Sequence, residues 1–124
     1  MNIQVKEELI DGILMYAQDF HPREIILLLS GSTDDIIEVN EVILPPASVR
    51  GLSFSEFQPY LLPFDLSILG LVHSHPSGVL TPSIYDLNHF YGRIMMITAY
   101  PYQSIEDIAI FNAQGHTIPF KSVP

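Results

Sequence analysis

The stretch from Ser67 to Asp86 constrains the fold of this chain more than any other. Its first part, Ser67 to Val72, is an apolar run that predicts a buried strand, and the strand continues into His73-Ser74-His75. Successive side chains of a strand point to opposite faces, so His73 and His75 are predicted to point to the same side. Pro76-Ser77-Gly78 then breaks the strand. Two imidazoles are therefore expected to share one side of a strand end.

A helix is predicted shortly after this strand. Thr81-Pro82 offers an N-cap followed by a first-turn proline, and Ser83 to Tyr91 continues with a helical pattern. Ser83 and Asp86 are three residues apart, so they lie on one face of that helix. If the helix packs beside the strand end, two nitrogens and a carboxylate oxygen converge, with a hydroxyl nearby. Three protein ligands with a fourth position left for water are typical of a catalytic zinc site.

Simpler interpretations of the same residues stay open. A lone histidine at a strand end is more often a surface or packing residue. Ser83-x-x-Asp86 is also the pattern of a capping box, although Thr81-Pro82 would start the helix two residues earlier. His89 competes with Asp86 as a ligand, but a solvated position suits it better. Glu24 alone is explained as a solvated charge at the mouth of a strand.

Composition limits the class of protein. The 124 residues are 48% apolar, which favours a single domain over residues 1–124 with a modest core. The formal charge of −9 argues against a nucleic-acid partner, because phosphate backbones bind basic surfaces. There is no cysteine, which excludes disulfides and thiolate zinc sites. Neither a signal-peptide pattern nor an apolar run of about 18 residues is present, so we expect a soluble, cytoplasmic protein without a membrane segment.

The rest of the chain predicts strands interleaved with two helices. Val5 to Phe20 carries an apolar helical stripe and ends at His21-Pro22. Glu24 immediately precedes a strand that is apolar on both faces, Ile25 to Leu29, as in a covered sheet. Turn residues then lead into a second strand, Ile36 to Leu44, so the two are expected to form a hairpin.

The second half of the chain adds shorter strands. Residues 45–64 contain four prolines and are expected to hold one short strand within substrate-facing loops. Further strands are predicted at 93–99, 105–111 and 116–120, and Pro119 favours an edge position for the last of them. His21 and His116 lie in turn-like surroundings and are predicted to be surface residues. The whole pattern favours a two-layer or three-layer α/β domain.

Taken together, these residues resemble the JAMM/MPN+ family of zinc isopeptidases. The order of helix, glutamate-bearing strand, His-x-His strand and Ser/Asp helix matches over nearly the whole chain, and the length is similar to that of stand-alone archaeal members. Many relatives have a glycine shortly after the glutamate where this chain has Leu27, a difference that affects packing more than chemistry. The residues that carry the resemblance are His73-Ser74-His75, Ser83 and Asp86, with Glu24 upstream in His-Pro-Arg-Glu and Ser30-Gly31 after the first apolar strand.

The resemblance implies a fold like that of the cytidine deaminases, a twisted mixed β-sheet packed with two main α-helices. It implies that His73, His75 and Asp86 hold one zinc ion per chain, whose charge lowers the pKa of its water to about 7. Glu24 would be the general base that takes the proton of the water and delivers it to the departing amine. Ser83 would help to stabilise the oxyanion of the tetrahedral intermediate.

The implied reaction is hydrolysis of the isopeptide or peptide bond after the C-terminal glycine of a ubiquitin-like modifier. Conjugates of ubiquitin-like or small modifier proteins are the expected partners, since an extended glycine-ended tail can lie along a strand edge. Two other interpretations stay open. One is a non-catalytic scaffold of the same fold, and the other is a relative of the RadC-type proteins, whose signature resembles His75-Pro76-Ser77-Gly78 followed by Pro82-Ser83. A zinc deaminase is excluded, because that class requires a cysteine pair.

Overall fold

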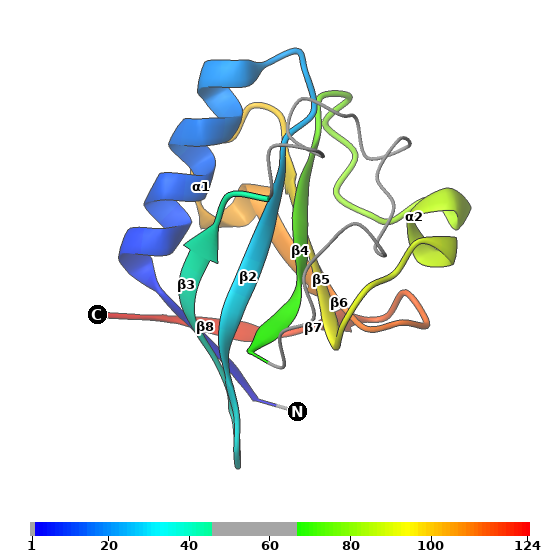
Figure 1. The fold of residues 1–124 in the computed structure, drawn as a ribbon. Coiled ribbons are helices and arrows are strands. Elements are labelled where there is room, and N and C mark those ends of the chain that lie inside the picture. The colour runs from blue at the N-terminus through cyan, green and yellow to red at the C-terminus, as the bar shows by residue number, and fades with distance from the viewer. Residues whose placement is uncertain (1, 46–66) are drawn as a thin grey trace.

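The computed structural model describes residues 2–45 and 67–124, whose arrangement is shown in Figure 1. The strand and loops predicted within 45–64 lie, apart from Pro45, outside the described residues. In chain order the elements are β1 (Ile3–Lys6), α1 (Glu7–Phe20), β2 (Ile26–Thr33), β3 (Ile37–Ile43), β4 (Ile68–His75), α2 (Ile84–Asn88), β5 (Ile94–Ala99), the 3₁₀ turn η3 (Ile105–Asp107), β6 (Ile108–Phe111), β7 (Thr117–Ile118) and β8 (Phe120–Val123).

The described residues contribute eight strands to one mixed sheet, in the order β7-β6-β5-β4-β2-β3-β1-β8. β1 runs parallel to β3 and β8, and β4 runs parallel to β5, whereas the other neighbours are antiparallel. The edge strands β7 and β8 are separated in sequence by Pro119 alone. Opposite edges of the sheet therefore come close together, and the sheet is nearly closed. Proline has no N–H to donate to a ladder, which suits this crossing point between two edges.

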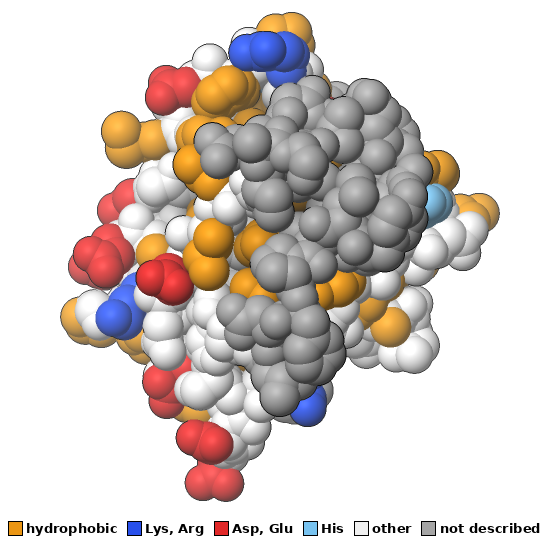
Figure 2. All heavy atoms as spheres, viewed as in Figure 1, with side chains coloured by type: hydrophobic (Ala, Val, Ile, Leu, Met, Phe, Trp, Pro, Cys, Tyr) orange, Lys and Arg blue, Asp and Glu red, His pale blue; other side chains and the backbone are white. Residues whose placement is uncertain are grey.

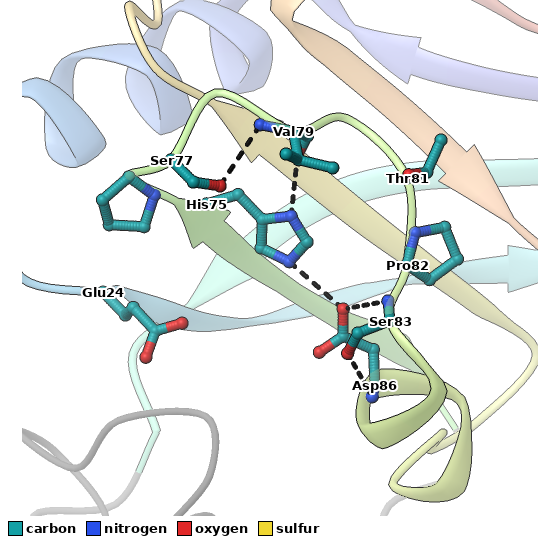
Figure 3. Close-up of a pocket in the computed structure, with 9 residues that line it drawn as sticks. Glu24, His75, Ser77, Val79, Thr81, Pro82, Ser83 and Asp86 are labelled. Atoms are coloured by element: carbon teal, nitrogen blue, oxygen red, sulfur yellow. Dashed lines mark hydrogen bonds and ion pairs between the residues drawn. The ribbon is translucent and has the colours of Figure 1, made fainter.

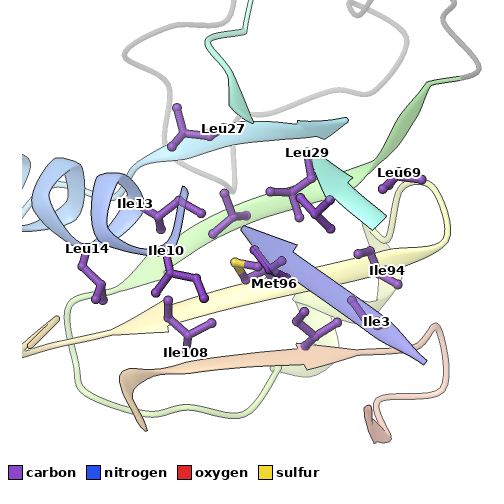
Figure 4. Close-up of a cluster of buried hydrophobic side chains, with 14 of the residues drawn as sticks. Ile3, Ile10, Ile13, Leu14, Leu27, Leu29, Leu69, Ile94, Met96 and Ile108 are labelled. Atoms are coloured by element: carbon purple, nitrogen blue, oxygen red, sulfur yellow. The ribbon is translucent and has the colours of Figure 1, made fainter. Parts of the chain in front are cut away.

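α1 packs against one face of the sheet. Its buried residues recur at helical spacing, so that one stripe faces the strands. Figure 4 shows this stripe meeting side chains of β1, β2 and β5 in the larger of the two apolar clusters that the described residues form. The members of the stripe are Ile10, Ile13, Leu14 and Ala17.

The smaller apolar cluster lies on the opposite face, where α2 is found (Figure 1). Side chains of β2 alternate between the two clusters: Leu27 and Leu29 join the larger one, while Ile26 and Leu28 join the smaller one. Burial on both faces explains why this strand reads as a continuous apolar run. The predicted mixed α/β sheet with two helices is confirmed, as is the β2–β3 hairpin. The likeness to cytidine deaminases stays a prediction.

Several predicted boundaries were wrong. The helix predicted from Val5 begins only at Glu7, because Ile3–Lys6 forms a strand between β3 and β8 with alternating burial. The first residues of the strand predicted at 105–111 form the turn η3, and the segment 116–120 is divided at Pro119.

Figure 2 shows acidic side chains spread over the part of the surface formed by α1 and the β2–β3 hairpin, in keeping with the net negative charge. Among the described residues, no helix is long and apolar enough to cross a membrane.

Candidate metal centre

β4 carries the two predicted histidines to the same side of its C-terminal end. His73 is fully buried between β2 and β5, where it pairs with Ile26 and Ile97. His75 is the last residue of the strand and is partly exposed. Their Nε2 atoms face each other at 3.1 Å.

The turn after β4 fixes the orientation of the His75 ring. Gly78 has a φ of +86°, which glycine adopts without strain, and its N–H donates to the carbonyl of His75. The chain then returns so that the Val79 carbonyl accepts a hydrogen bond from His75 Nδ1 at 2.7 Å. A carbonyl can only accept, so Nδ1 carries the proton. In the neutral ring, Nε2 is then left with a lone pair facing His73, which is how a second partner commonly orients a metal-binding histidine.

α2 positions the carboxylate. Ser83 caps the helix: its Oγ accepts from the Asp86 N–H at 3.0 Å, and Asp86 Oδ2 accepts from the Ser83 N–H at 2.9 Å. The helix start predicted at Thr81-Pro82 was therefore wrong, and the capping box that it argued against is present. The helix is also shorter than predicted, because it ends at Asn88 rather than Tyr91.

Three side chains converge closely enough to share a small cation. The carboxylate of Asp86 reaches His75 Nε2 at 3.2 Å through Oδ2 and His73 Nε2 at 3.5 Å through Oδ1. In Figure 3, His75 and Asp86 point toward one another across the pocket. Tetrahedral zinc with bonds of about 2.0–2.1 Å separates its ligand atoms by about 3.3 Å. The three separations lie close to this value, so His73, His75 and Asp86 fit a zinc ion.

The protonation states of these three side chains favour binding of a cation. Burial on its own raises the pKa of Asp86, but its close contacts with the two imidazoles and the hydrogen bond from the Ser83 amide outweigh it and hold that pKa well below its usual range. Burial lowers the pKa of His73 despite the nearby carboxylate of Asp86. Burial also acts to lower the pKa of His75, but hydrogen bonds to Asp86 and the Val79 carbonyl raise it overall. At neutral pH the carboxylate is ionised and the His73 ring is uncharged.

Glu24 lies beside this cluster, two residues before the start of β2. It lines the same pocket as His75 and Asp86. The negative charge of Glu24 acts to raise the pKa of His73 and of His75. Figure 3 shows it on the side of the pocket opposite α2. The pocket has a volume of about 560 Å³ and is lined by Glu24, His75, Pro76, Ser77, Val79, Thr81, Pro82, Ser83 and Asp86.

The other histidines stay outside the cluster. His89 stacks on Tyr85 with ring centroids 4.0 Å apart, and its Nδ1 bonds the Tyr85 carbonyl. His116 is exposed, as predicted. His21 is also exposed overall, but its Nδ1 lies 3.2 Å from the Tyr102 hydroxyl.

The sequence matches the family Prok-JAB, prokaryotic homologs of the JAB domain, over residues 6–113. The chain belongs to this JAB family. A probable metalloprotease of Haloferax volcanii is 32% identical in an alignment of 121 residues that covers 91% of this JAB chain and 74% of the relative.

Solved structures agree with this assignment. The JAB1/MPN domain protein of Archaeoglobus fulgidus is 32% identical, with a TM-score of 0.72 and 100% of both chains covered. A JAMM structure described as a metalloprotease-like zinc site in the proteasome and signalosome is 30% identical, again with a TM-score of 0.72 and 100% coverage of both chains. The predicted resemblance to the JAMM/MPN+ family is confirmed. This chain is thus a member of a metalloprotease-like family. Its own His73, His75 and Asp86 are placed so that they can bind a metal ion.

Sequence reasoning missed two contributors to the JAB site. The Val79 carbonyl orients His75, but a backbone acceptor has no signature in the sequence. Ser74 lies between the two histidines and bonds the Ile25 amide next to Glu24. The alternation of side chains along a strand could have indicated the orientation of Ser74, because it places the middle residue of His-x-His on the face opposite the two histidines.

Proposed function

We propose that this JAB protein is a zinc-dependent peptidase or isopeptidase that hydrolyses the bond after the C-terminal glycine of a ubiquitin-like modifier. The observation that carries the proposal is the convergence of His73, His75 and Asp86, of which His75 and Asp86 line one open pocket together with Glu24. The family assignment and the likeness to a JAMM structure with a metalloprotease-like zinc site support it.

In this proposal His73, His75 and Asp86 hold one zinc ion per chain. Zinc held there supplies a Lewis acid that polarises a carbonyl and lowers the pKa of a water toward neutrality. His73 binds as an uncharged ring, because its burial lowers its pKa. His75 is held in its binding orientation by the Val79 carbonyl, and Asp86 by the cap of α2.

Glu24 is the proposed general base. Its carboxylate accepts a proton from the attacking water and then donates that proton to the nitrogen of the departing amine. The water oxygen ends in the new carboxyl group of the modifier, which loses the second proton of the water to solvent as it ionises, and the C–N bond breaks. Atoms balance without any covalent bond between substrate and protein.

Ser83 is the proposed oxyanion donor. Its Oγ already accepts the Asp86 N–H, but a hydroxyl that accepts one hydrogen bond still has its own hydrogen to donate. Ser83 also lines the pocket, so this hydrogen can serve a carbonyl oxygen that becomes negative there. A single residue thus both begins α2 and stabilises developing charge.

The proposed substrate is an extended tail that ends in glycine. The loop between β4 and α2 contributes Pro76, Val79 and Pro82 to the pocket wall. These residues offer apolar contacts and backbone groups without charge, which suits recognition of a tail mainly through its main chain. The leaving group is a lysine side-chain amine or a peptide amine.

The test is cleavage of a defined conjugate. Zinc-loaded protein is incubated, in water enriched in heavy oxygen, with a ubiquitin-like modifier joined through its C-terminal glycine to a lysine side chain. We expect intact modifier carrying heavy oxygen in its terminal carboxylate, together with the free amine, and at least about a hundredfold slower product formation by Glu24→Gln. If zinc-loaded wild type cleaves neither isopeptide-linked nor peptide-linked conjugates, the proposal is wrong and a non-catalytic scaffold is favoured.

A further inference from the structure

Ser74 holds the backbone of the residue that follows Glu24. The antiparallel ladder between β2 and β4 ends at the pair Ile26–His73. Beyond this pair, the Ile25 N–H donates to Ser74 Oγ at 2.9 Å, and the Ile25 carbonyl accepts from the Ser74 N–H at 3.2 Å. Both main-chain polar groups of Ile25 are therefore satisfied by Ser74, one of them through its side chain.

The Ser74 side chain is itself well enclosed. Its exposure is 0%, and it points away from the two imidazoles because residues alternate along β4. On that side its hydroxyl faces Tyr102, which is 1% exposed. Burial raises the pKa of the Tyr102 hydroxyl, and the nearby Ser74 hydroxyl partly offsets this rise.

Tyr102 is fixed from three sides. Its hydroxyl lies 3.2 Å from His21 Nδ1, its N–H donates to the Ala99 carbonyl at 2.9 Å, and its own carbonyl accepts from Gln18 Nε2. It also packs within the larger apolar cluster. Ser74 thus sits between a rigid tyrosine on one side and the amide of Ile25 on the other.

This arrangement links Glu24 to the strand that carries the ligand histidines. We propose that Ser74 is a positioning residue for Glu24: its hydroxyl holds the Ile25 amide and so sets where the Glu24 carboxylate lies relative to His75. The proposal rests on the role of Glu24 as general base. A change of the Ser74 hydroxyl is expected to move Glu24 while leaving the metal ligands in place.

Thr98 offers a matched control. It pairs with Ser74 on the neighbouring strand β5 and is equally buried. Its hydroxyl has no hydrogen-bond partner within the described part of the chain. Thr98→Val therefore removes a buried hydroxyl from the same layer without releasing any main-chain group, whereas Ser74→Ala releases the Ile25 amide.

The first readouts do not depend on activity. Amide hydrogen exchange, followed by NMR in the zinc-loaded protein, should be faster at Ile25 in Ser74→Ala than in wild type, and unchanged in Thr98→Val. Crystal structures of the same three proteins should show the Glu24 carboxylate displaced or spread over several positions only in Ser74→Ala. Wild-type exchange at Ile25 together with a wild-type position of Glu24 would overturn the proposal.

Kinetics supply the second readout. Because a misplacement of about 1 Å can lower a rate about a hundredfold, we expect Ser74→Ala to lose about tenfold to a hundredfold in kcat. KM and bound zinc should stay at wild-type levels, and Thr98→Val should keep the wild-type kcat. In the Glu24→Gln background, Ser74→Ala should cause no further loss, since there is no base left to position.

Equal losses from Ser74→Ala in both backgrounds would mean a general structural effect and would overturn the proposal. If Ser74→Ala does not fold, Tyr102→Phe replaces it, because it keeps the buried ring and removes the hydroxyl beside Ser74. The same non-additivity with Glu24→Gln is then expected. If wild type hydrolyses no conjugate, the proposed function fails, but exchange at Ile25 and the position of Glu24 still decide whether Ser74 has this role.

Discussion

Acidification should weaken zinc binding by protonating His75 first and His73 only at lower pH. A histidine must be neutral to coordinate a metal, so protons compete with zinc for each ring. In the metal-free protein, the pKa of His75 lies above the ordinary value of 6.5, because Asp86 and the Val79 carbonyl outweigh its burial. The pKa of His73 lies below that value because of its burial. Lowering the pH therefore charges His75 first, and this charge further opposes protonation of His73.

The size of the effect follows from counting protons. Each pH unit below the pKa of one competing ligand lowers the apparent zinc affinity tenfold, or by about 1.4 kcal/mol. Between the pKa of His75 and that of His73, the logarithm of affinity should thus rise with pH with a slope of one. A slope of two is expected only below the pKa of His73. Asp86 adds no proton in this range, because its pKa is held well below its usual value.

The assay is competition for zinc with a chromophoric chelator at a series of pH values, corrected for protonation of the chelator. His116→Ala serves as a control, because this exposed histidine lies outside the cluster and should leave the slope unchanged. A slope of two extending from neutral pH would contradict the opposite shifts of the two histidines. An affinity that does not vary with pH would contradict histidine ligation itself.

The remaining predictions concern single substitutions. Glu24→Gln should keep stoichiometric zinc but lose about a hundredfold to ten-thousandfold in turnover, and comparable activity in steady-state assays would remove the general-base role. His75→Ala and Asp86→Ala should each lose zinc together with activity. If metal analysis shows that both variants still bind zinc tightly, the ligands are misassigned. Ser83→Ala should keep zinc, lose about a hundredfold in kcat as an oxyanion donor, and lower the free energy of unfolding by about 1 kcal/mol as an N-cap. Unchanged denaturant midpoints for Ser83→Ala would refute the capping contribution.

The central part of the fold followed from local patterns. The alternation of a strand was enough to predict that His73 and His75 share a side, and apolar runs with turn residues between them predicted the β2–β3 hairpin. The spacing of Ser83 and Asp86 predicted that they lie together on one side of the same helix, of which Ser83 proves to be the N-cap. These features depend on neighbours close in sequence.

The parts that sequence reasoning missed depend on distant neighbours. β1 is four residues long, and its pairing partners β3 and β8 are remote in the chain, while Val5 also fits the helical stripe that follows. At α2 two cap signals competed, and the reciprocal bonds of Ser83 and Asp86 prevailed over Thr81-Pro82. The hydrogen bonds between Ser74 and Ile25 depend on β2 and β4 lying side by side, so a local sequence pattern does not indicate them.

Conjugate cleavage, measured while zinc is removed and then restored, tests whether hydrolysis depends on a metal ion held by His73, His75 and Asp86. Chelation should abolish cleavage, and activity should return in proportion to added zinc and reach its maximum at one ion per chain. Asp86→Asn keeps an oxygen that can cap α2 but lacks the charge, so its activity should not return at the same zinc concentration. Full cleavage by protein from which all metal has been removed would contradict zinc-dependent hydrolysis at this site.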